Sequence, residues 1–391
     1  ALHYAARNGH LNLVSLLLER GADIAARSNG GQLALHCAAW ENHTEVVAFL
    51  LDKDTDILQA KSNSGYDALY CAAFEGNLEL VKLLLDRDAD LKATDNDGHI
   101  ALHCAAQEGH IEVVSLLVER GACIDARDNE GVAPIHLAAW MGHISVVTYL
   151  LDRRVNVNTL DNEGKTSLHY AAAFNSDPSM VSLLLQRDAD IGAADNDGTT
   201  ALHYAAEKCH LDVVSLLMDQ KADITARKED GATALHCAAD SGHCEMVSLL
   251  LERDADIAAK DNDGLTALHC AASNGHAEVV TRLLTQGAHI AGVNNDGLTA
   301  LHCAARNGHF QVVSILLEHD ADISASDHNG LTVLHHAVTS GNVDVVAHLL
   351  DKRANAHALT KDGHNPLSYM ILDKDSDMDD GYLAVVRLFF D

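Results

Sequence analysis

The chain has 391 residues, of which 48% are hydrophobic, 4% are aromatic and 21% are charged. Its 57 Asp and Glu residues outnumber its 27 Lys and Arg residues, which gives a formal net charge of −30. An excess of negative charge of this size repels nucleic acid and anionic lipid, so we expect neither as a partner. No apolar run approaches the roughly 18 residues that a membrane-spanning helix needs, so we also expect no insertion into a membrane.

A Leu-His pair followed by small residues recurs along the whole chain. Tyr70 and Ser368 take the place of the histidine in two of the twelve copies. The other ten copies contain His3, His36, His103, His136, His169, His203, His236, His269, His302 and His335. The copies are 33 residues apart, except for two steps of 34, from 36 to 70 and from 169 to 203. A period of this length indicates a stack of similar units in which each unit contacts only its neighbours.

Residues 95–127 illustrate one unit. The run from Asp95 to Gly98 has the residue types of a tight turn. Small and apolar residues from Ala101 to Gly109 predict a short first helix, and the apolar spacing from Ile111 to Val118 predicts a second. Neither helix is long enough to be stable alone, so each must bury its apolar stripe against the next unit.

The repeated residues resemble the ankyrin repeat. The shared pattern is Asp-x-x-Gly-x-Thr-x-Leu-His-x-Ala-Ala-x-x-Gly-His-x-x-Val-Val-x-Leu-Leu-Leu, and it is most complete over 261–284 and 294–317. The resemblance implies an all-α solenoid, in which each repeat has two antiparallel helices and a β-hairpin finger. The curved, right-angled stack would have fingers and first helices along a concave binding face. We expect a single solenoid over 1–391, with repeats near 1–27, 28–61, 62–94, 95–127, 128–160, 161–194, 195–227, 228–260, 261–293, 294–326, 327–359 and 360–391.

Several positions depart from the pattern. The longer steps place one extra residue near 54–61 and one near 176–178, where we expect surface bulges. The residue after the second helix, where a left-handed backbone is expected, is Gly in a few repeats, such as Gly121. In others it is Asp, such as Asp88, which tolerates that conformation second best.

The residue before the first helix differs between the two halves of the chain. A Thr in most C-terminal repeats, such as Thr266, could cap the helix with its hydroxyl. Leu33, Ile100 and Ala133 cannot accept that hydrogen bond, although Asp67 could. We therefore expect the N-terminal half to be less stable, because a lost cap costs about 0.5–2 kcal/mol.

The 26 histidines and nine cysteines are interpreted as parts of the repeat rather than as a metal site. The resemblance implies that the histidines bond to turns and to the backbone of neighbouring repeats. The group from His236 to Cys244 lacks the close ligand spacing of zinc sites. Six cysteines share one position of the repeat, and stacked helices hold equivalent atoms about 8–10 Å apart, too far for a disulfide. We therefore expect small buried thiols in a reducing, cytoplasmic or otherwise intracellular compartment.

The last repeat contains an acidic insertion over 373–381. Asp373, Asp375 and Asp377 have the spacing of a calcium-binding loop. Met378 and Ala384, however, occupy the places where such a loop needs Gly and a bidentate Glu. We therefore expect an acidic loop here and regard calcium as a weak alternative.

The repeats disagree most at the two positions after each Ala-Ala pair, which the resemblance places on the concave face. Both tryptophans of the chain and two of its six phenylalanines occupy these positions, all between 40 and 174. Together with the adjoining fingers they define a candidate binding surface of Trp40, Glu41, Tyr66, Phe74, Glu75, His99, Gln107, Glu108, Val132, Trp140, Met141 and Phe174. Exposed aromatic residues with an acidic rim predict a groove for apolar anchors. The alternative is that the rings fold onto neighbouring helices and extend the core.

These patterns predict a protein-interaction scaffold without catalytic residues, enzyme activity or cofactor. The expected partner is a protein or peptide with apolar or aromatic anchors and some basic character, bound by a monomeric array. We expect the array to be the recognition region of a larger multidomain protein. The alternative function is a mechanical spacer with no dedicated groove.

Overall fold

The computed structural model describes residues 1–372 and 380–390. The contacts divide the chain into two units, unit 1 (Ala1–Asn196) and unit 2 (Asp197–Asp391). Each unit is described separately below, and a single solenoid over the whole chain stays a prediction. Asp373, Asp375 and Asp377 lie outside the described residues, so the calcium hypothesis also stays a prediction.

Unit 1 contains six helix pairs, one pair for each repeat. The helices are α1 (Leu2–Arg7), α2 (Leu11–Glu19), α3 (Ala34–Trp40), α4 (Thr44–Lys53), the 3₁₀ helix η1 (Asp56–Gln59), α5 (Ala68–Phe74), α6 (Leu78–Leu85), α7 (Ala101–Gln107), α8 (Ile111–Glu119), α9 (Pro134–Trp140), α10 (Ile144–Asp152), α11 (Ser167–Phe174) and α12 (Ser179–Gln186).

Unit 2 continues the alternation of a first and a second helix. Its helices are α13 (Ala201–Glu207), α14 (Leu211–Asp219), α15 (Ala234–Asp240), α16 (Cys244–Glu252), α17 (Ala267–Ser273), α18 (Ala277–Thr285), α19 (Ala300–Arg306), α20 (Phe310–Glu318), α21 (Val333–Ser340), α22 (Val343–Asp351), α23 (Pro366–Leu372) and α24 (Asp380–Leu388).

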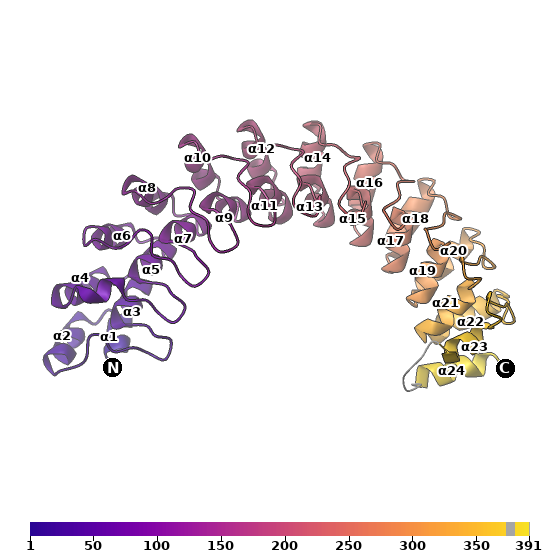
Figure 1. Ribbon diagram of the computed structural model, residues 1–391, viewed down its shortest axis with the longest axis horizontal. Helices are drawn as coiled ribbons and strands as arrows, with labels where there is room; N and C mark the ends of the chain where they lie inside the picture. The colour runs from indigo at the N-terminus through magenta and orange to yellow at the C-terminus, as the bar shows by residue number, and fades with distance from the viewer. Residues whose placement is uncertain (373–379, 391) are drawn as a thin grey trace. The chain divides into compact units, whose positions relative to one another are not determined.

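In each unit the odd-numbered helices form one row and the even-numbered helices another (Figure 1). The Ala-Ala pairs explain the close packing of the first row, because a methyl group lets neighbouring backbones approach. Ala105 and Ala106, for example, have no exposed surface. This arrangement confirms the predicted all-α repeat architecture.

The fingers are tight turns rather than β-hairpins. An isolated β-bridge joins Ser326 to Thr332, and the described residues form no strand. In the finger of residues 95–99, the Asp95 N–H donates to the His99 carbonyl over 3.0 Å. The Asp95 carboxylate also accepts the backbone N–H groups of Asp97 and His99. The predicted tight turn is therefore confirmed, but no β-strands extend from it to form a hairpin.

An asparagine ladder connects the fingers of unit 1. Each rung is a finger asparagine whose side-chain amide donates to the backbone carbonyl of the preceding finger over 2.9–3.1 Å. The donors are Asn63, Asn96, Asn129, Asn162 and Asn196. In unit 2, Asn262 and Asn295 make the same bond over 2.8 Å. The ladder fixes the spacing of the fingers.

The repeated histidines join each repeat to its neighbours. Nδ1 of His103 accepts the Ile100 N–H over 3.1 Å, and its Nε2–H donates to the carbonyls of Ala126 and Val132 over 3.1 Å. At the turn between the helices, His110 donates instead to the preceding repeat, at the Phe74 carbonyl over 2.9 Å. The expectation that these imidazoles bond neighbouring backbone is confirmed at such positions, although the buried Nε2 of His203 has no hydrogen-bond partner among the described residues.

The expectation that Thr hydroxyls cap the first helices is wrong for most repeats. In Thr166, Thr200, Thr233, Thr266 and Thr332 the hydroxyl makes no cap bond to the helix backbone. It lies 2.8–2.9 Å from Nδ1 of the histidine three residues later. In these repeats Nδ1 also accepts the backbone N–H of the Thr, whereas at Leu33, Ile100 and Ala133 it accepts the backbone N–H alone. The basis for a weaker N-terminal half is therefore removed.

Three positions before first helices do use a side-chain cap, Asp67 and Thr299 as expected and also Asn365, which accepts the Ser368 N–H over 2.9 Å. The Asp67 carboxylate accepts the Tyr70 N–H over 2.8 Å, so this repeat keeps a cap without a histidine. Thr299 accepts the His302 N–H over 3.4 Å. Side-chain capping thus depends on the local residue set rather than on the half of the chain.

The two extra residues are accommodated differently. Near 54–61 the expected surface bulge is wrong, because η1 forms there and buries Ile57 and Leu58. Near 176–178 the inserted residues Ser176 and Asp177 are exposed, as expected. There Asn175 replaces the turn histidine and donates to the Ala139 carbonyl over 2.9 Å.

A left-handed residue follows the second helix in each unit, as predicted at Gly121 (φ +97°) and Asp88 (φ +62°). The same conformation is imposed on Lys221, at φ +67°. We expect Lys221→Gly to raise the free energy of unfolding by about 0.5–1 kcal/mol, because a left-handed backbone strains any residue with a Cβ. Urea denaturation followed by circular dichroism measures the change.

The matched control is the neighbouring Gln220, whose φ is −87°. Gln220→Gly should lower the free energy of unfolding, because glycine loses more conformational entropy on folding. At this right-handed position there is no strain for glycine to relieve. Equal changes in the two variants would show that the left-handed backbone stores no strain.

None of the helices in the described parts of the chain is long and apolar enough to cross a membrane.

Candidate partner-binding surface

The positions after each Ala-Ala pair lie at the C-terminal ends of the first helices. In unit 1 these ends follow one another from α3 to α11, since each first helix packs against the next. The aromatic residues predicted at these positions gather in two groups, each of which also contains tyrosine rings from neighbouring positions. We call them the first ring cluster (Trp40, Tyr66, Tyr70 and Phe74) and the second ring cluster (Trp140, Tyr170 and Phe174).

The first ring cluster connects α3, α5 and the finger between them. Trp40 stacks on Phe74 with ring centroids 5.3 Å apart and lies 5.6 Å from Tyr66. Tyr66 stacks on Tyr70 at 5.6 Å, and its hydroxyl accepts the Gln32 side-chain amide over 2.7 Å. All four rings are half-buried, so the cluster presents their edges.

The second ring cluster is more open. Trp140 lies 5.1 Å from Phe174 and 6.2 Å from Tyr170. Trp140 is 39% exposed and Phe174 is 54% exposed, and the neighbouring Met141 is 48% exposed. Large apolar side chains with this exposure indicate a surface that another molecule can cover.

Tyr170 holds this cluster in place. Its hydroxyl donates to Oδ2 of Asp161 over 2.7 Å. Burial, followed by this bond to the carboxylate, raises the pKa of Tyr170 above its usual range. The phenol therefore stays protonated, and its ring forms a fixed base beneath Trp140.

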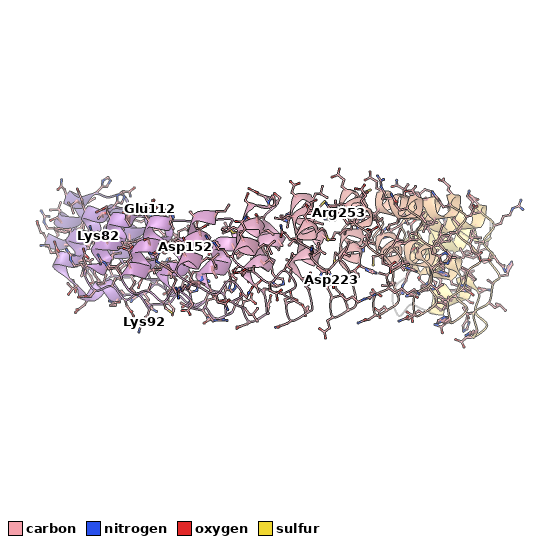
Figure 2. All side chains as sticks on the ribbon, turned by 90° about the horizontal axis from the view of Figure 1, so that it is seen from above. Lys82, Lys92, Glu112, Asp152, Asp223 and Arg253 are labelled. Atoms are coloured by element: carbon pink, nitrogen blue, oxygen red, sulfur yellow. The ribbon has the colours of Figure 1, made fainter. Side chains whose placement is uncertain are left out.

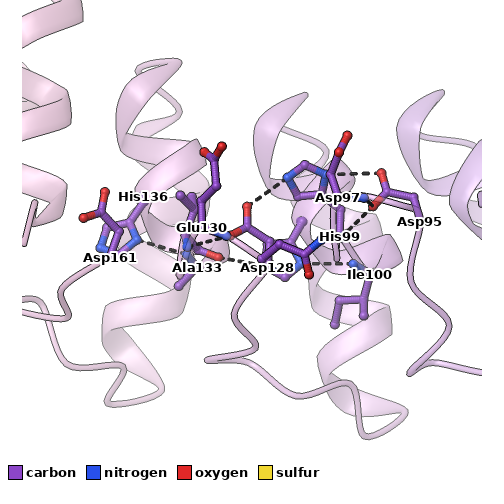
Figure 3. Close-up of polar contacts among 12 residues, drawn as sticks. Asp95, Asp97, His99, Ile100, Asp128, Glu130, Ala133, His136 and Asp161 are labelled. Carbon is purple, nitrogen blue, oxygen red and sulfur yellow. Dashed lines mark hydrogen bonds and ion pairs between the residues drawn. The ribbon is translucent and has the colours of Figure 1, made fainter. Parts of the chain in front are cut away.

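A histidine bridge lies between the two ring clusters (Figure 3). Nδ1 of His99 is 3.2 Å from Oδ2 of Asp95, and Nε2 is 3.1 Å from Oδ2 of Asp128. Both nitrogens thus face a carboxylate, one on its own finger and one on the next. Ligand atoms of Asp95, Asp97 and His99 also lie within 4.8 Å of one another, but His99 already has a carboxylate at each nitrogen. We therefore interpret the group as a clip between fingers.

The remaining predicted site residues occupy different environments. Val132 is only 6% exposed and belongs to the core, so it contributes no exposed contact. Gln107 and Glu108 are partly exposed between the ring clusters, and Glu75 is partly exposed beside the first. Glu41 is exposed and forms an ion pair of 3.4 Å with Arg7.

The sequence analysis missed Tyr70 and Tyr170 as members of the surface. Tyr70 occupies the histidine position of its repeat and Tyr170 the following position, both of which were assigned to the scaffold. The sequence did contain a sign of their role. Tyr70 departs from the histidine of the repeat, and both tyrosines lie in the same segment of the chain as the tryptophans.

The opposite row of helices has a different character. A basic residue at the end of one second helix pairs with an aspartate of the preceding one, as in Arg120–Asp86 at 2.9 Å and Arg187–Asp152 at 3.1 Å in unit 1. In unit 2 Arg253 pairs with Asp219 over 3.0 Å. One member of each of the last two pairs, Asp152 and Arg253, is labelled in Figure 2. Exposed pairs of this kind contribute little stability.

Paired helices, a finger turn and histidines that join neighbouring repeats define this protein as a helical-repeat array. Protein-family models described as ankyrin repeats in three copies match residues 1–61, 56–128, 124–195, 168–261 and 255–327. A second model, described as ankyrin repeats in many copies, matches residues 308–350. The chain therefore belongs to the ankyrin-repeat family, whose repeats generally serve as protein-interaction modules. No curated protein sequence matches the chain.

Proposed function

We propose that unit 1 binds a protein or peptide partner on the surface formed by its two ring clusters. The observation that carries this proposal is the exposure of Trp140, Met141 and Phe174 beside one another in a chain with only 4% aromatic residues. Aromatic side chains held in place by their neighbours lose little entropy on binding, and such residues dominate interface energies.

The surface favours a partner with apolar anchors and some basic residues. The ring clusters supply the apolar contacts, whereas Glu75 and Glu108 supply negative charge beside and between them. The net charge of −30 favours association with a basic partner over an acidic one. An extended or helical peptide with separated apolar residues would satisfy both ring clusters.

The proposal is tested with peptides selected from a random display library on the full chain. In the triple variant Trp40→Ala/Phe74→Ala/Trp140→Ala we expect the selected peptides to bind at least tenfold more weakly, because each ring removed costs contact area at the centre of the surface. Isothermal titration calorimetry measures the dissociation constants. The helical circular dichroism should stay unchanged, because each of these rings keeps part of its surface exposed.

Phe310→Ala is the matched control, because Phe310 is 44% exposed but belongs to unit 2. It should leave the affinity unchanged. Equal affinities for wild type and triple variant would contradict the proposed surface. Loss of helical structure in the triple variant would instead assign the rings to the core. A library that yields no binder would favour the spacer function.

A further inference from the structure

Unit 2 contains a cavity that the proposed function does not use. It lies against α15, between α13 and α17, beneath the finger turns that precede α15 and α17. Its volume is about 310 Å³. This is the lower end of the range for ligand sites, about 300–1,000 Å³, and suits one long side chain better than a larger ligand.

The walls of the cavity are acidic. Glu207, Asp230, Asp240 and Asp261 line it, together with Lys228 and with His236, whose pKa is lowered by burial. Lys228 lies 3.5 Å from Asp230, and Glu207 pairs with Lys208 over 2.8 Å.

The other two carboxylates have no cationic partner in the described part of unit 2. Oδ1 of Asp240 accepts the Asn274 side-chain amide over 2.7 Å. Oδ1 of Asp261 accepts the backbone N–H groups of Asp263 and Leu265, and no described residue bonds its Oδ2.

Two other repeats show a side chain that bonds this second oxygen. Nine residues after the turn aspartate, Tyr170 donates to Oδ2 of Asp161 over 2.7 Å. In the same relation, His336 Nε2 lies 3.1 Å from Oδ2 of Asp327. In the repeat of Asp261 that position is Cys270, whose side chain is too short to fill the space. The cavity thus lies where those two repeats place a planar side chain that donates a hydrogen bond to the aspartate.

The base of the cavity is uncharged. Burial raises the pKa of Cys237 and of Cys270 to about 12, so both thiols are neutral at neutral pH. A ligand that fits would therefore combine an apolar stem with a cationic end. A guanidinium is planar and offers several donors to carboxylates, whereas an ammonium acts as a point charge.

We propose that this cavity, the acidic pocket, receives an arginine side chain of a protein partner. The stem would pass between the finger turns, and the guanidinium would donate to Asp261 and Asp240. The acidic pocket lies in unit 2 and the ring clusters in unit 1, so either proposal can fail without the other.

The test uses three capped tripeptides and the full chain. The peptides are acetyl-Gly-Arg-Gly-amide, the same peptide with lysine, and the same peptide with citrulline, which keeps the shape of arginine without its charge. Titration is followed by ¹H–¹⁵N TROSY NMR at the amides of Ala232, Asp261 and Leu265. We expect the arginine peptide to bind at least fivefold more tightly than either of the other two.

Two variants locate the binding. Asp261→Asn should weaken it at least fivefold and still fold, because Asn294 accepts the same two turn amides in a neighbouring repeat. Cys270→Tyr should abolish it by supplying the side chain that other repeats have. Asp263→Asn, an exposed carboxylate of the same turn, should change the affinity by less than twofold.

Three outcomes would overturn the proposal. The first is equal binding of the arginine and citrulline peptides, and the second is equal binding of the arginine and lysine peptides. The third is an affinity for the arginine peptide that Cys270→Tyr leaves unchanged. The triple variant of the ring clusters should bind the arginine peptide as the wild type does.

Discussion

Acidification from pH 7.5 to 4.5 is expected to lower the urea midpoint of the folded array steeply. Burial lowers the pKa of His36, His103 and His302 from 6.5 to about 4. Burial also lowers the pKa of His136, His203, His236, His269 and His335. These imidazoles stay neutral in the folded chain, where Nδ1 accepts a backbone N–H.

The direction follows from proton binding. Between about pH 6.5 and 4 the unfolded chain binds more protons than the folded chain, because its histidines have their ordinary pKa. The free energy of unfolding is therefore highest above pH 6.5 and falls as the pH decreases through this window. Each histidine with a pKa near 4 contributes on the order of 3 kcal/mol across it, at about 1.4 kcal/mol per pH unit.

The pH series is measured by circular dichroism at fixed ionic strength. His103→Gln should reduce the pH dependence by about one proton, since His103 has no exposed surface. His357→Gln is the control, because His357 is exposed and should leave the slope unchanged. A urea midpoint that is constant or rises from pH 6.5 to 4.5 would contradict the expected role of the buried imidazoles.

Gly131→Ala is expected to destabilise unit 1 much more than Gly121→Ala. Both glycines have a left-handed backbone, with φ +78° and +97°, so both variants have a strain cost of about 1–2 kcal/mol. A Cβ at Gly121 would meet no atom within 4 Å. A Cβ at Gly131 would lie 2.4 Å from Oδ1 and 2.8 Å from the backbone N of Asn162. That overlap should lower the free energy of unfolding of Gly131→Ala by about 1–3 kcal/mol more, the usual cost of overpacking a core.

The cost arises from the asparagine ladder. The Asn162 N–H donates to the Glu130 carbonyl over 2.9 Å, and its side chain donates to the Asn129 carbonyl over 3.1 Å. The Cβ would push both donors away from the preceding finger. Urea denaturation measures the stability, and hydrogen exchange at the Asn162 amide reports the local contact. Equal stabilities, together with a protected Asn162 amide in both variants, would show that the close approach is unimportant.

The sequence was sufficient for most of the fold because each structural role recurs at one position. The left-handed Asp88 and the two-helix repeat follow from such recurrence, and the histidine bonds follow from the resemblance to the ankyrin repeat. The prediction of Thr caps was wrong for most repeats, because a hydroxyl before the helix has two possible partners. A sequence pattern does not show that Nδ1 of the buried histidine competes with the helix backbone for the Thr hydroxyl.

The candidate surface was harder to predict than the fold. The positions of Trp40, Phe74, Trp140 and Phe174 followed from the repeat, and the structure places them in two ring clusters. Val132 lies on a finger as expected, but its side chain is buried and offers no exposed contact. The absence of a long side chain at Cys270 left no sign in the sequence, since cysteine is the commonest residue at that position.

The junctions between repeats also bear on how such a chain can change in length. The repeat of His103 and its neighbour carry a donor for the repeat before, as in His110 and Asn129, and a donor for the repeat after, as in His103. A tandem duplication of one 33-residue segment would therefore reproduce both halves of each new junction without any further substitution. Insertions of other lengths break these pairs unless, as η1 does, they supply new packing of their own. Growth by whole repeats is thus the route that costs the least adjustment.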